Sequence, residues 1–380
     1  VRSRLADADF FIKKDMQVPL DERIKQLERI RFYDKLGHMK DKALRLEYLS
    51  GELASIFKVE KNIAKRAGLL AKIDLTTYMV DEIPKLQGYI GGYYANKFNE
   101  KNDISLAISE HYKPLSSHGE LPASLSGNMV AIADRIDTLI GFWLIDAKPT
   151  GSRDPMALRR AATALVRILI HSKIYFSLNQ WLDLAGSLYH IKTTPESFAK
   201  IKDDLIFFIL ERIKILFEGQ PFALNILSNL LSEKRFDCPY SMVILTNKLA
   251  NFLETSNGKK LLSSCRRVDN ILRAEEESEN QIYQGKPQAD LILLDEEKTL
   301  WKTLEPLLKH YKNTIKIDSI LELIDQLNIL YTPIEQFFEK VTVNDPRQNL
   351  RKNRLELLAC VRNLMHVIIK FSNLSKPESE

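Results

Sequence analysis

The sequence predicts an all-α protein built from two helical modules, and three observations lead to that prediction. Turn punctuation is scarce, because only 14 glycines and 14 prolines are spread over 380 residues. Apolar residues recur at helical spacing, most clearly at Leu158, Ala161, Leu165 and Ile168, which fall on one helical face. The hydrophobic fraction of 45% is ordinary for a globular protein and sufficient for a sizeable core.

The first module begins with two helical blocks. Residues 21–56 and 63–90 carry apolar side chains at helical spacing, and the Gly91–Gly92 pair closes the second block. Residues 112–128 are rich in Pro, Ser and Gly, which predicts a long loop. A further helix follows, with isoleucines at every fourth position from Ile132. We expect about five or six packed helices and no strand in this module.

A Pro-Thr-Gly-Ser turn precedes the next predicted helix. Asp154 can accept the free amides of a first helical turn, and Pro155 suits a position where no amide hydrogen is needed. Residues 176–200 are predicted to be a connector, and residues 201–380 a second helical module. Within that module, the acidic stretch 274–297 is predicted to be a solvated loop or helix face.

Composition excludes several classes of protein. Three cysteines without a metal-type spacing argue against a disulfide framework and fit a reducing, cytoplasmic compartment. No apolar run approaches the roughly 18 residues of a membrane-spanning helix, so no membrane partner is expected. The net charge of +5 is compatible with a polyanionic partner. The chain begins without Met or a signal peptide, and we interpret it as a fragment of a longer protein.

Familiar catalytic signatures are absent from the sequence. It has no GxxxxGK[ST] phosphate loop, no strand-linked GxGxxG, and neither HExxH nor GxSxG. No His, Ser or Cys stands in a context typical of a nucleophile or a general base. We therefore expect no catalytic residue in this chain.

One stretch of the first module resembles a metal-binding motif whose ligands have been replaced. Residues 67–74 (AGLLAKID) are similar to the ALLHDIG-type segment of HD-domain proteins, in which a His-Asp doublet binds a divalent metal. Ala71 and Lys72 occupy the places of the doublet, and an ammonium group repels a cation. Asp134 matches the distant aspartate of the motif. The resemblance implies an HD-like fold with a degenerate metal site and no bound metal.

Two alternatives stay open for this module. Asp74, His111 and Asp134 could form a shifted metal site, which would support a metal-dependent phosphohydrolase. His38 and His111 are candidates for remnant ligands. Asp134 and Asp137 lie three residues apart on one helical face, and the simpler hypothesis is that they make salt bridges or caps.

Five longer segments, spread over most of the chain, resemble one family. They are DKLGHMKDKALRL (34–46), AKIDLTTYMVDEIPKLQGYIGGYYA (71–95), PTGSRDPMALRRAA (149–162), CRRVDNIL (265–272) and FFEKVTVNDPRQNLRKNRLELL (337–358). They are similar to the β subunit of the two-subunit bacterial glycyl-tRNA synthetase, and the third matches almost residue for residue. The chain departs from the family at His38, where Ser or Thr is usual, and at Gly91–Gly92, where Gly-Arg is usual.

The resemblance implies a division of the chain. Residues 1–175 would be the HD-like domain, 176–200 the connector, and 201–380 a helical, DALR-like anticodon-binding domain of the type shared with arginyl-tRNA synthetases. From the same resemblance we expect the family's β subunit to have a further N-terminal half that is not part of this sequence.

The resemblance also implies a function, the binding of tRNA(Gly) within glycine–tRNA ligase. The α subunit, in an expected α2β2 tetramer, would carry out glycylation with ATP and Mg²⁺. Motifs for ATP and amino-acid activation are not recognisable here. This chain alone is therefore expected to hold no cofactor and to be inactive.

Basic and polar groups near helix ends are the candidates for tRNA contact. Guanidinium groups bind phosphates in a bidentate manner, and helix N-termini favour anions. The candidates are Arg153, Arg159, Arg160, Arg266, Arg267, Asn270, Arg347, Arg351, Lys352, Asn353 and Arg354. The 4-3 spacing of the three arginines from Arg347 would place them on one face of a helix. Phe337 and Phe338 are candidates for stacking with anticodon bases.

Most of these groups have a structural alternative. The Arg159–Arg160 pair could clamp the domain junction, the two phenylalanines could belong to the core, and Asn353 and Arg354 could hold helices together. The chain could also be a scaffold subunit without RNA contact. In that case acidic neighbours should neutralise the arginine clusters.

Overall fold

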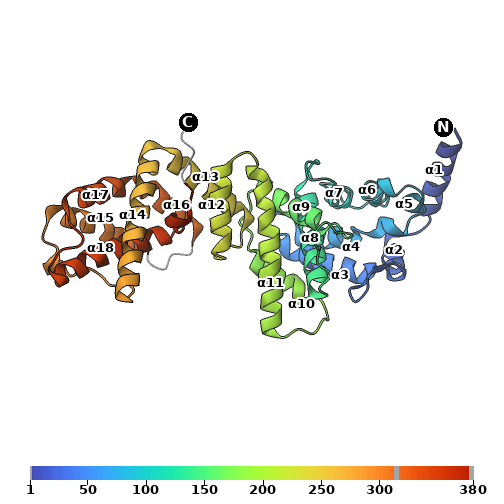
Figure 1. Ribbon diagram of the computed structural model, residues 1–380. Helices are drawn as coiled ribbons and strands as arrows, with labels where there is room; N and C mark the ends of the chain where they lie inside the picture. Colours follow the sequence, from blue (N-terminus) through green and yellow to red (C-terminus); the bar gives the residue numbers. More distant parts are fainter. Residues whose placement is uncertain (1, 312–315, 376–380) are drawn as a thin grey trace. The chain divides into compact units, whose positions relative to one another are not determined.

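The computed structural model describes residues 2–311 and 316–375 and divides into two compact units. Unit 1 comprises Val1–Ile213 with Asp237–Tyr240, and unit 2 comprises Lys214–Phe236 with Ser241–Glu380. Helices form almost all the regular structure of both units (Figure 1). The all-α fold class predicted from the sequence is therefore confirmed. None of the described helices is long and apolar enough to cross a membrane.

Unit 1 contains a series of helices, with its longest connections before and after α8. They are α1 (Arg2–Asp15), α2 (Leu20–Gln26), α3 (Met39–Leu53), α4 (Lys61–Leu70), α5 (Tyr78–Glu82), α6 (Tyr89–Lys97), α7 (Asn102–Glu110), α8 (Leu125–Leu144), α9 (Leu158–His171), α10 (Leu178–Ser187) and α11 (Pro195–Leu210). Short 3-10 turns lie at Leu27–Arg29, Ile73–Thr76 and Pro84–Leu86, and another follows α11 at Glu211–Phe217.

Helix α8 is the centre of unit 1. Its sequence is apolar on nearly all sides, and most of its side chains are buried. Helices α3, α4, α7, α9, α10 and α11 all pack against it. The Ser124 hydroxyl caps its first turn by accepting a hydrogen bond from the Gly127 amide at 2.9 Å. Charged residues carried by α8 are consequently placed inside the unit.

The first predicted helical block is interrupted by a hairpin. Residues 21–56 contain two short antiparallel strands, β1 (Arg31–Tyr33) and β2 (Gly37–His38), between α2 and α3. The turn between them uses positive φ angles of 64° at Lys35 and 83° at Gly37. The expectation of a strand-free first module is therefore wrong at this hairpin, which the helical spacing of the flanking apolar residues conceals.

The second predicted block, 63–90, is also divided. A 3-10 turn separates α4 from α5, and the Thr77 hydroxyl caps α5 by accepting from the Val80 amide at 3.2 Å. Pro84 follows the end of α5, where a residue without an amide hydrogen cannot continue the helix. Periodicity therefore indicates the helical content of this region but not its breaks.

The segment 176–200, predicted to be a connector, is largely helical. It contains α10, which packs against α8, and the start of α11, which Thr194 caps. The Phe176 and Trp181 rings stack with their centroids 5.2 Å apart. In the structure this segment therefore packs as part of unit 1.

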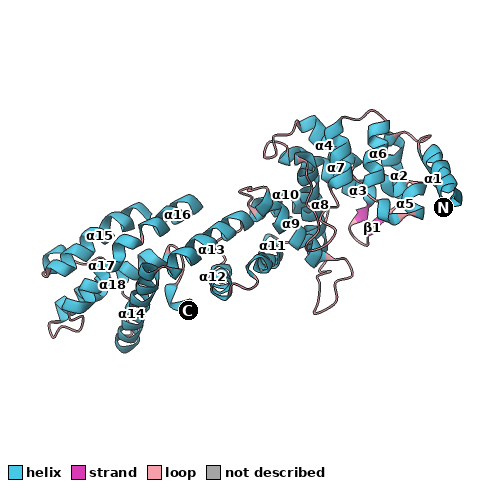
Figure 2. Ribbon diagram, turned by 90° about the horizontal axis from the view of Figure 1, so that it is seen from above, coloured by secondary structure: helices cyan, strands magenta, loops and turns pink. Residues whose placement is uncertain are grey.

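Unit 2 is a bundle of longer helices. They are α12 (Pro221–Ser232), α13 (Pro239–Glu254), α14 (Ser256–Glu279), α15 (Asp295–Tyr311), α16 (Ile317–Gln326), α17 (Asn328–Lys340) and α18 (Gln348–His366), with 3-10 turns at Ala289–Leu291 and Phe371–Asn373. Helix α15 lies beside α17 and α18 (Figure 2). Helix α14 packs against the same two helices, so the basic segments of α14 and α18 belong to one packed group.

Candidate nucleic-acid interface

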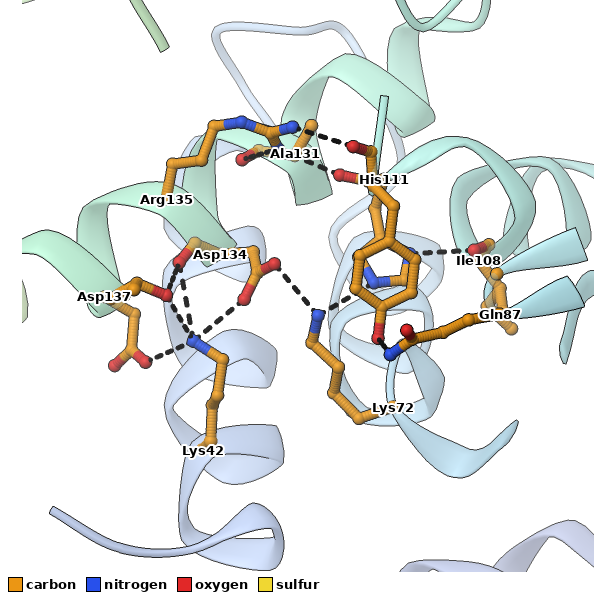
Figure 3. Close-up of polar contacts among 12 residues, drawn as sticks. Lys42, Lys72, Gln87, Ile108, His111, Ala131, Asp134, Arg135 and Asp137 are labelled. Carbon is orange, nitrogen blue, oxygen red and sulfur yellow. Dashed lines mark hydrogen bonds and ion pairs between the residues drawn. The ribbon is translucent and has the colours of Figure 1, made fainter. Parts of the chain in front are cut away.

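Unit 1 holds a buried charged cluster at the place where its sequence resembles a metal site (Figure 3). Lys72 follows the last turn of α4, and its Nζ lies 2.9 Å from Asp134 Oδ2 on α8 and 3.0 Å from His111 Nε2 after α7. His111 Nδ1 lies 2.7 Å from the Ile108 carbonyl oxygen. We therefore assign the ring proton to Nδ1, and Nε2 accepts from Lys72. The Lys72 ammonium thus fills the space between a carboxylate and an imidazole.

A second ammonium group, that of Lys42 on α3, completes this cluster. Its Nζ lies 2.8 Å from Asp134 Oδ1 and 2.9 Å from Asp137 Oδ2, and it donates to the Thr138 hydroxyl at 2.8 Å. Arg45, also on α3, pairs with Asp137 at 2.6 Å. The predicted salt-bridging role of Asp134 and Asp137 is therefore confirmed.

Burial and charge act in opposite directions on these groups. Burial alone would raise the pKa of Asp134, but the ammonium groups of Lys42 and Lys72 outweigh it and hold that pKa well below its usual value. Burial lowers the pKa of Lys72 to about 8, against the attraction of Asp134. Burial and the Lys72 charge hold the pKa of His111 well below its usual value. At neutral pH the cluster therefore contains its own cations and a neutral imidazole.

This arrangement does not fit a divalent metal. Ala71 is buried and supplies no ligand, and Asp74 uses Oδ2 to accept from the Gly88 amide at 2.5 Å. His38 is exposed at the start of α3, where its amide donates to Asp41. Within residues 2–311 and 316–375, no group of three or more His, Cys, Asp or Glu side chains is placed to hold a metal ion.

Lys42 and Arg45 are important members of the cluster that the sequence does not single out. Both are basic residues on the buried face of α3, beside Ala43 and Leu46. The sequence could have indicated them only by two basic residues, three positions apart, on an otherwise apolar helix face. This indication is weak when the helix that packs against that face is not known.

In unit 2, the arginines at the start of α18 are tied to acidic partners. Arg354 is buried, with Nε 2.6 Å from Glu297 Oε1 and Nη1 2.8 Å from Asp345 Oδ2. Arg347 Nε pairs with the other oxygen of Asp345 at 2.9 Å. Hydrogen bonds from the side chain and amide of Arg347, and from Arg354, hold the pKa of Asp345 well below its usual value. These contacts join α18 to the start of α15.

Asn353 and Phe337 are held inside the bundle as well. The buried Asn353 side chain accepts from the Gln288 amide at 2.6 Å and donates to the Gln288 carbonyl at 3.3 Å. Phe337 is fully buried. This geometry favours the alternative in which Asn353, Arg354 and Phe337 hold helices together.

The acidic end of α14 supplies further counter-charges. Arg351 pairs with both Glu275 and Glu279, and Arg362 Nη2 lies 2.8 Å from Glu276 Oε1. Most of this acidic stretch is exposed, as predicted, but Glu275 and Glu276 are half-buried and paired with arginines. The packing of α14 against α18 brings them opposite arginines that are distant in the sequence.

Another pair of candidates faces an open groove. Arg267 on α14 is exposed, and its guanidinium lies 4.2 Å from the centre of the Phe338 ring on α17. Exposed Asn270 lies one turn further along α14, and all three residues line a groove of about 600 Å³ that Asn344 also borders. A guanidinium held over an aromatic ring can neutralise a phosphate while the ring supports a base.

The start of α9 shows the predicted cap with a shifted boundary. Asp154 Oδ1 and Oδ2 accept from the Leu158 and Arg159 amides at 2.8 and 2.9 Å. Helix α9 begins at Leu158, so Pro155 lies in the turn before it and not at the first helical position. The correction follows from Ala157, which adopts a left-handed conformation and resets the helix start.

The remaining candidates fall into two groups, those whose side chains form contacts within the protein and those whose side chains are exposed. Arg159 donates to the Gly151 carbonyl at 2.6 Å and holds that turn, and Arg266 donates to the Leu374 carbonyl. The candidates that are exposed and form no ion pair within the described ranges, 2–311 and 316–375, are Arg153, Arg160, Arg267, Asn270 and Lys352.

The first 232 residues of the chain decide its family. Residues 1–232 match the family model described as glycyl-tRNA synthetase beta subunit. The chain belongs to the glycyl-tRNA synthetase beta subunit family. Residues 261–379 match a second model, the DALR anticodon binding domain. Both matches agree with the resemblance found in the sequence.

Individual members of the glycyl-tRNA synthetase beta subunit family align with almost the whole chain. It is 34% identical over 374 residues to the glycine–tRNA ligase beta subunit of Histophilus somni (strain 129Pt), covering 98% of this chain and 53% of that protein. The corresponding protein of Rhodospirillum centenum is 34% identical over 378 residues, covering 98% and 52%. That of Dichelobacter nodosus is 33% identical over 375 residues, covering 99% and 53%. The chain spans about half the length of these curated relatives.

Proposed function

We propose that this chain binds tRNA(Gly) as part of the β subunit of a glycine–tRNA ligase. The observation that carries the proposal is the DALR match over residues 261–379, which contains the exposed Arg267, the half-buried Phe338 ring beneath it and their groove. The relatives' description as glycine–tRNA ligase beta subunits supports the identity of the tRNA. The five exposed candidates are proposed as tRNA contacts ahead of those engaged within the protein.

The groove gives a direct test of tRNA binding. A phosphate contact adds affinity for any tRNA and adds to its salt dependence. Arg267→Ala should therefore weaken tRNA(Gly) binding and lower the slope of log K against log salt by about one, measured between about 50 and 200 mM salt. Arg273→Ala is the matched control, because Arg273 is exposed on a different side of α14. Equal losses in both variants would contradict the groove assignment.

The chemistry of glycylation is proposed to require the α subunit. ATP and Mg²⁺ would act there, in an α2β2 enzyme of the cytoplasm, while this chain supplies tRNA binding. The proposal is supported by the absence of activation motifs from the sequence. We expect no glycine-dependent ATP–pyrophosphate exchange from this chain alone. Exchange that survives removal of contaminating synthetase would refute this division of labour.

The HD-like cluster of unit 1 is proposed to be structural, without phosphohydrolase activity. Lys42 and Lys72 provide the positive charge that a metal would otherwise bring to Asp134. Elemental analysis of protein prepared without chelators should give far less than one equivalent of zinc, manganese or iron. A stoichiometric metal, lost on Asp134→Asn, would restore the phosphohydrolase alternative.

A further inference from the structure

The chain passes between the two units more than once. It leaves unit 1 after Ile213, returns to it at Asp237 and enters unit 2 again at Ser241. Among the described residues beyond Ile213, only Asp237–Tyr240 belong to unit 1, and we call these four residues the strap. The strap therefore packs in unit 1, although the chain on both sides of it belongs to unit 2.

The strap binds the start of α10 through Asp237. The carbonyl oxygen of Asp237 accepts from the Leu178 amide at 3.1 Å, and its Oδ2 accepts from the Asn179 amide at 3.0 Å. The same Oδ2 accepts from the Ser177 hydroxyl at 2.6 Å, and Ser177 in turn accepts from the Gln180 amide at 3.2 Å. The first amides of a helix have no acceptor within the helix itself. Asp237 therefore supplies acceptors that α10 lacks, although it lies 60 residues beyond Ser177 in the sequence.

Two further contacts hold the strap against the residues that precede α10. The Phe176 amide donates to Cys238 Sγ at 3.3 Å. The Tyr240 ring lies edge-on to the Tyr175 ring, with the two centroids 5.3 Å apart. Side chains from both ends of the strap therefore contact unit 1, in addition to the cap that Asp237 provides.

The residues on either side of the strap are held in unit 2. Before the strap, Arg235 donates to the Val367 and Ile368 carbonyl oxygens, just after α18, at 3.0 and 2.9 Å. After the strap, α13 continues in unit 2, where Lys248 pairs with Asp325 of α16 at 2.7 Å. One residue separates Arg235 from the strap, and an extended residue spans at most about 3.5 Å. The chain therefore has little slack between its contacts in unit 2 and those of the strap.

We propose that the strap couples the stability of unit 1 to that of unit 2. While unit 2 is folded, the chain on both sides of the strap is fixed, so Asp237 stays on α10. When unit 2 unfolds, the strap is held only by its own contacts, and the start of α10 loses its acceptors. Because α10 packs against the central helix α8, this loss weakens unit 1. The inference is independent of tRNA binding, but a ligand that stabilises unit 2 would stabilise unit 1 as well.

The test destabilises unit 2 and measures the response of unit 1. The full chain is equilibrated at increasing urea concentrations and pulse-labelled with deuterium, so that peptides from α8 and α10 report on unit 1 and peptides from α17 and α18 on unit 2. Ile334→Val, in the buried core of unit 2, should lower the folded-to-unfolded ratio of that unit roughly 2- to 12-fold. With the strap intact, the urea midpoint of unit 1 should fall too. With Asp237→Ala added, only the midpoint of unit 2 should fall further.

The strap variants have their own expected results and control. Asp237→Ala alone should speed the exchange of the Leu178 and Asn179 amides roughly 2- to 30-fold, the range for loss of a helix cap. Asp237→Asn keeps an accepting oxygen and should retain most of the coupling. Ser177→Ala removes a donor to Asp237, and it replaces Asp237→Ala in the test if that variant does not fold. Asp203→Ala, at an exposed acid of α11 outside the strap, should leave the coupling unchanged.

Two outcomes would overturn this inference. If Ile334→Val lowers the midpoint of unit 2 and leaves that of unit 1 unchanged, the two units unfold independently. If the midpoint of unit 1 falls equally with and without Asp237→Ala, the units are coupled by something other than the strap. Neither outcome bears on tRNA(Gly) binding, which the Arg267→Ala variant tests separately.

Discussion

Both units contain ion pairs between basic side chains and carboxylates, at the charged cluster of unit 1 and at the start of α18 in unit 2. The two sites differ in how far these side chains are exposed to solvent. In unit 1, Lys42 and Lys72 are only 2% and 3% exposed, and both contact Asp134. In unit 2, one carboxylate, Asp345, joins the buried Arg354 to Arg347, whose side chain is 64% exposed. The first cluster is buried and inaccessible to ligands. The second extends from a buried arginine to an exposed one.

The difference teaches how to separate structural cations from binding cations. A buried cation has lost its hydration, so its partners are needed to offset that loss and are not available to a ligand. An exposed cation that forms no ion pair within the described residues, such as Arg267 or Lys309, retains its capacity to bind phosphate. The burial of a basic side chain and its ion-pair partners therefore indicate its function better than its location in an arginine-rich segment.

The largest effect is expected from opening the closed cluster. Lys42→Met removes one ammonium and leaves Asp134 and Asp137 buried with fewer partners, which should lower the free energy of unfolding by about 3–5 kcal/mol. Urea denaturation measures this loss. Lys40→Met, two residues earlier on α3, breaks only an exposed pair with Glu28 and should cost far less. Equal effects would show that burial does not distinguish these pairs.

A somewhat smaller effect is expected at α18. Arg354→Met leaves Glu297 and Asp345 without their shared cation and should destabilise unit 2 by about 3 kcal/mol. Arg347→Met removes the exposed partner of the same carboxylate and should have little effect on unfolding. The tRNA affinity of Arg354→Met should fall only as far as its folded fraction falls. Lost affinity in a fully folded variant would instead show that Arg354 contacts RNA.

The sequence predicts the helical fold and the family well because both depend on patterns repeated over many residues. The cap at Asp154 could be predicted for a different reason, because it depends only on residues next to it in the sequence. The hairpin at β1 and β2 and the helical nature of 176–200 could not, because short elements carry little periodic signal.

The predicted binding residues required knowledge of what faces them. Arg351 and Arg267 are both arginines in family-like segments, and nothing local to them distinguishes their surroundings. Only the packing of α14 against α17 and α18 puts Glu275 opposite Arg351 and the Phe338 ring opposite Arg267. Long-range packing of this kind is not readable from one sequence.

A pH-dependent effect is expected at Asp74, which lies close to the closed cluster. Burial raises the pKa of Asp74 from 3.8 to about 6, and Oδ1 has no hydrogen-bond partner in the described part of the chain. The folded state therefore holds a proton that the unfolded state releases, and this contribution to stability is lost as pH rises from 3.8 to about 6. Asp74→Asn cannot ionise, so its stability relative to the original chain should increase by roughly 1 kcal/mol between pH 5 and 7.5.

Urea denaturation at the two pH values measures this change. Asp81→Asn, an exposed acid of α5, is the control and should show no such pH dependence. A stability difference for Asp74→Asn that is constant from pH 5 to 7.5 would mean that Asp74 is ionised throughout this range in the folded protein. The hydrogen bond from the Gly88 amide and the neighbouring Lys72 charge would then outweigh burial in setting the pKa of Asp74.

The smallest effect is expected at Arg351, whose exposure is intermediate between that of the buried and the exposed cations. Its side chain is 17% exposed and already pairs with Glu275 and Glu279. Because these pairs are partly solvated, Arg351→Ala should cost well under about 1 kcal/mol of stability. It should also change tRNA(Gly) affinity by less than about twofold, since two carboxylates compete with phosphate for the guanidinium. A salt slope lowered by about one in a stable Arg351→Ala variant would show that Arg351 leaves its glutamates to bind RNA, and that ion pairing in the free protein does not exclude a binding role.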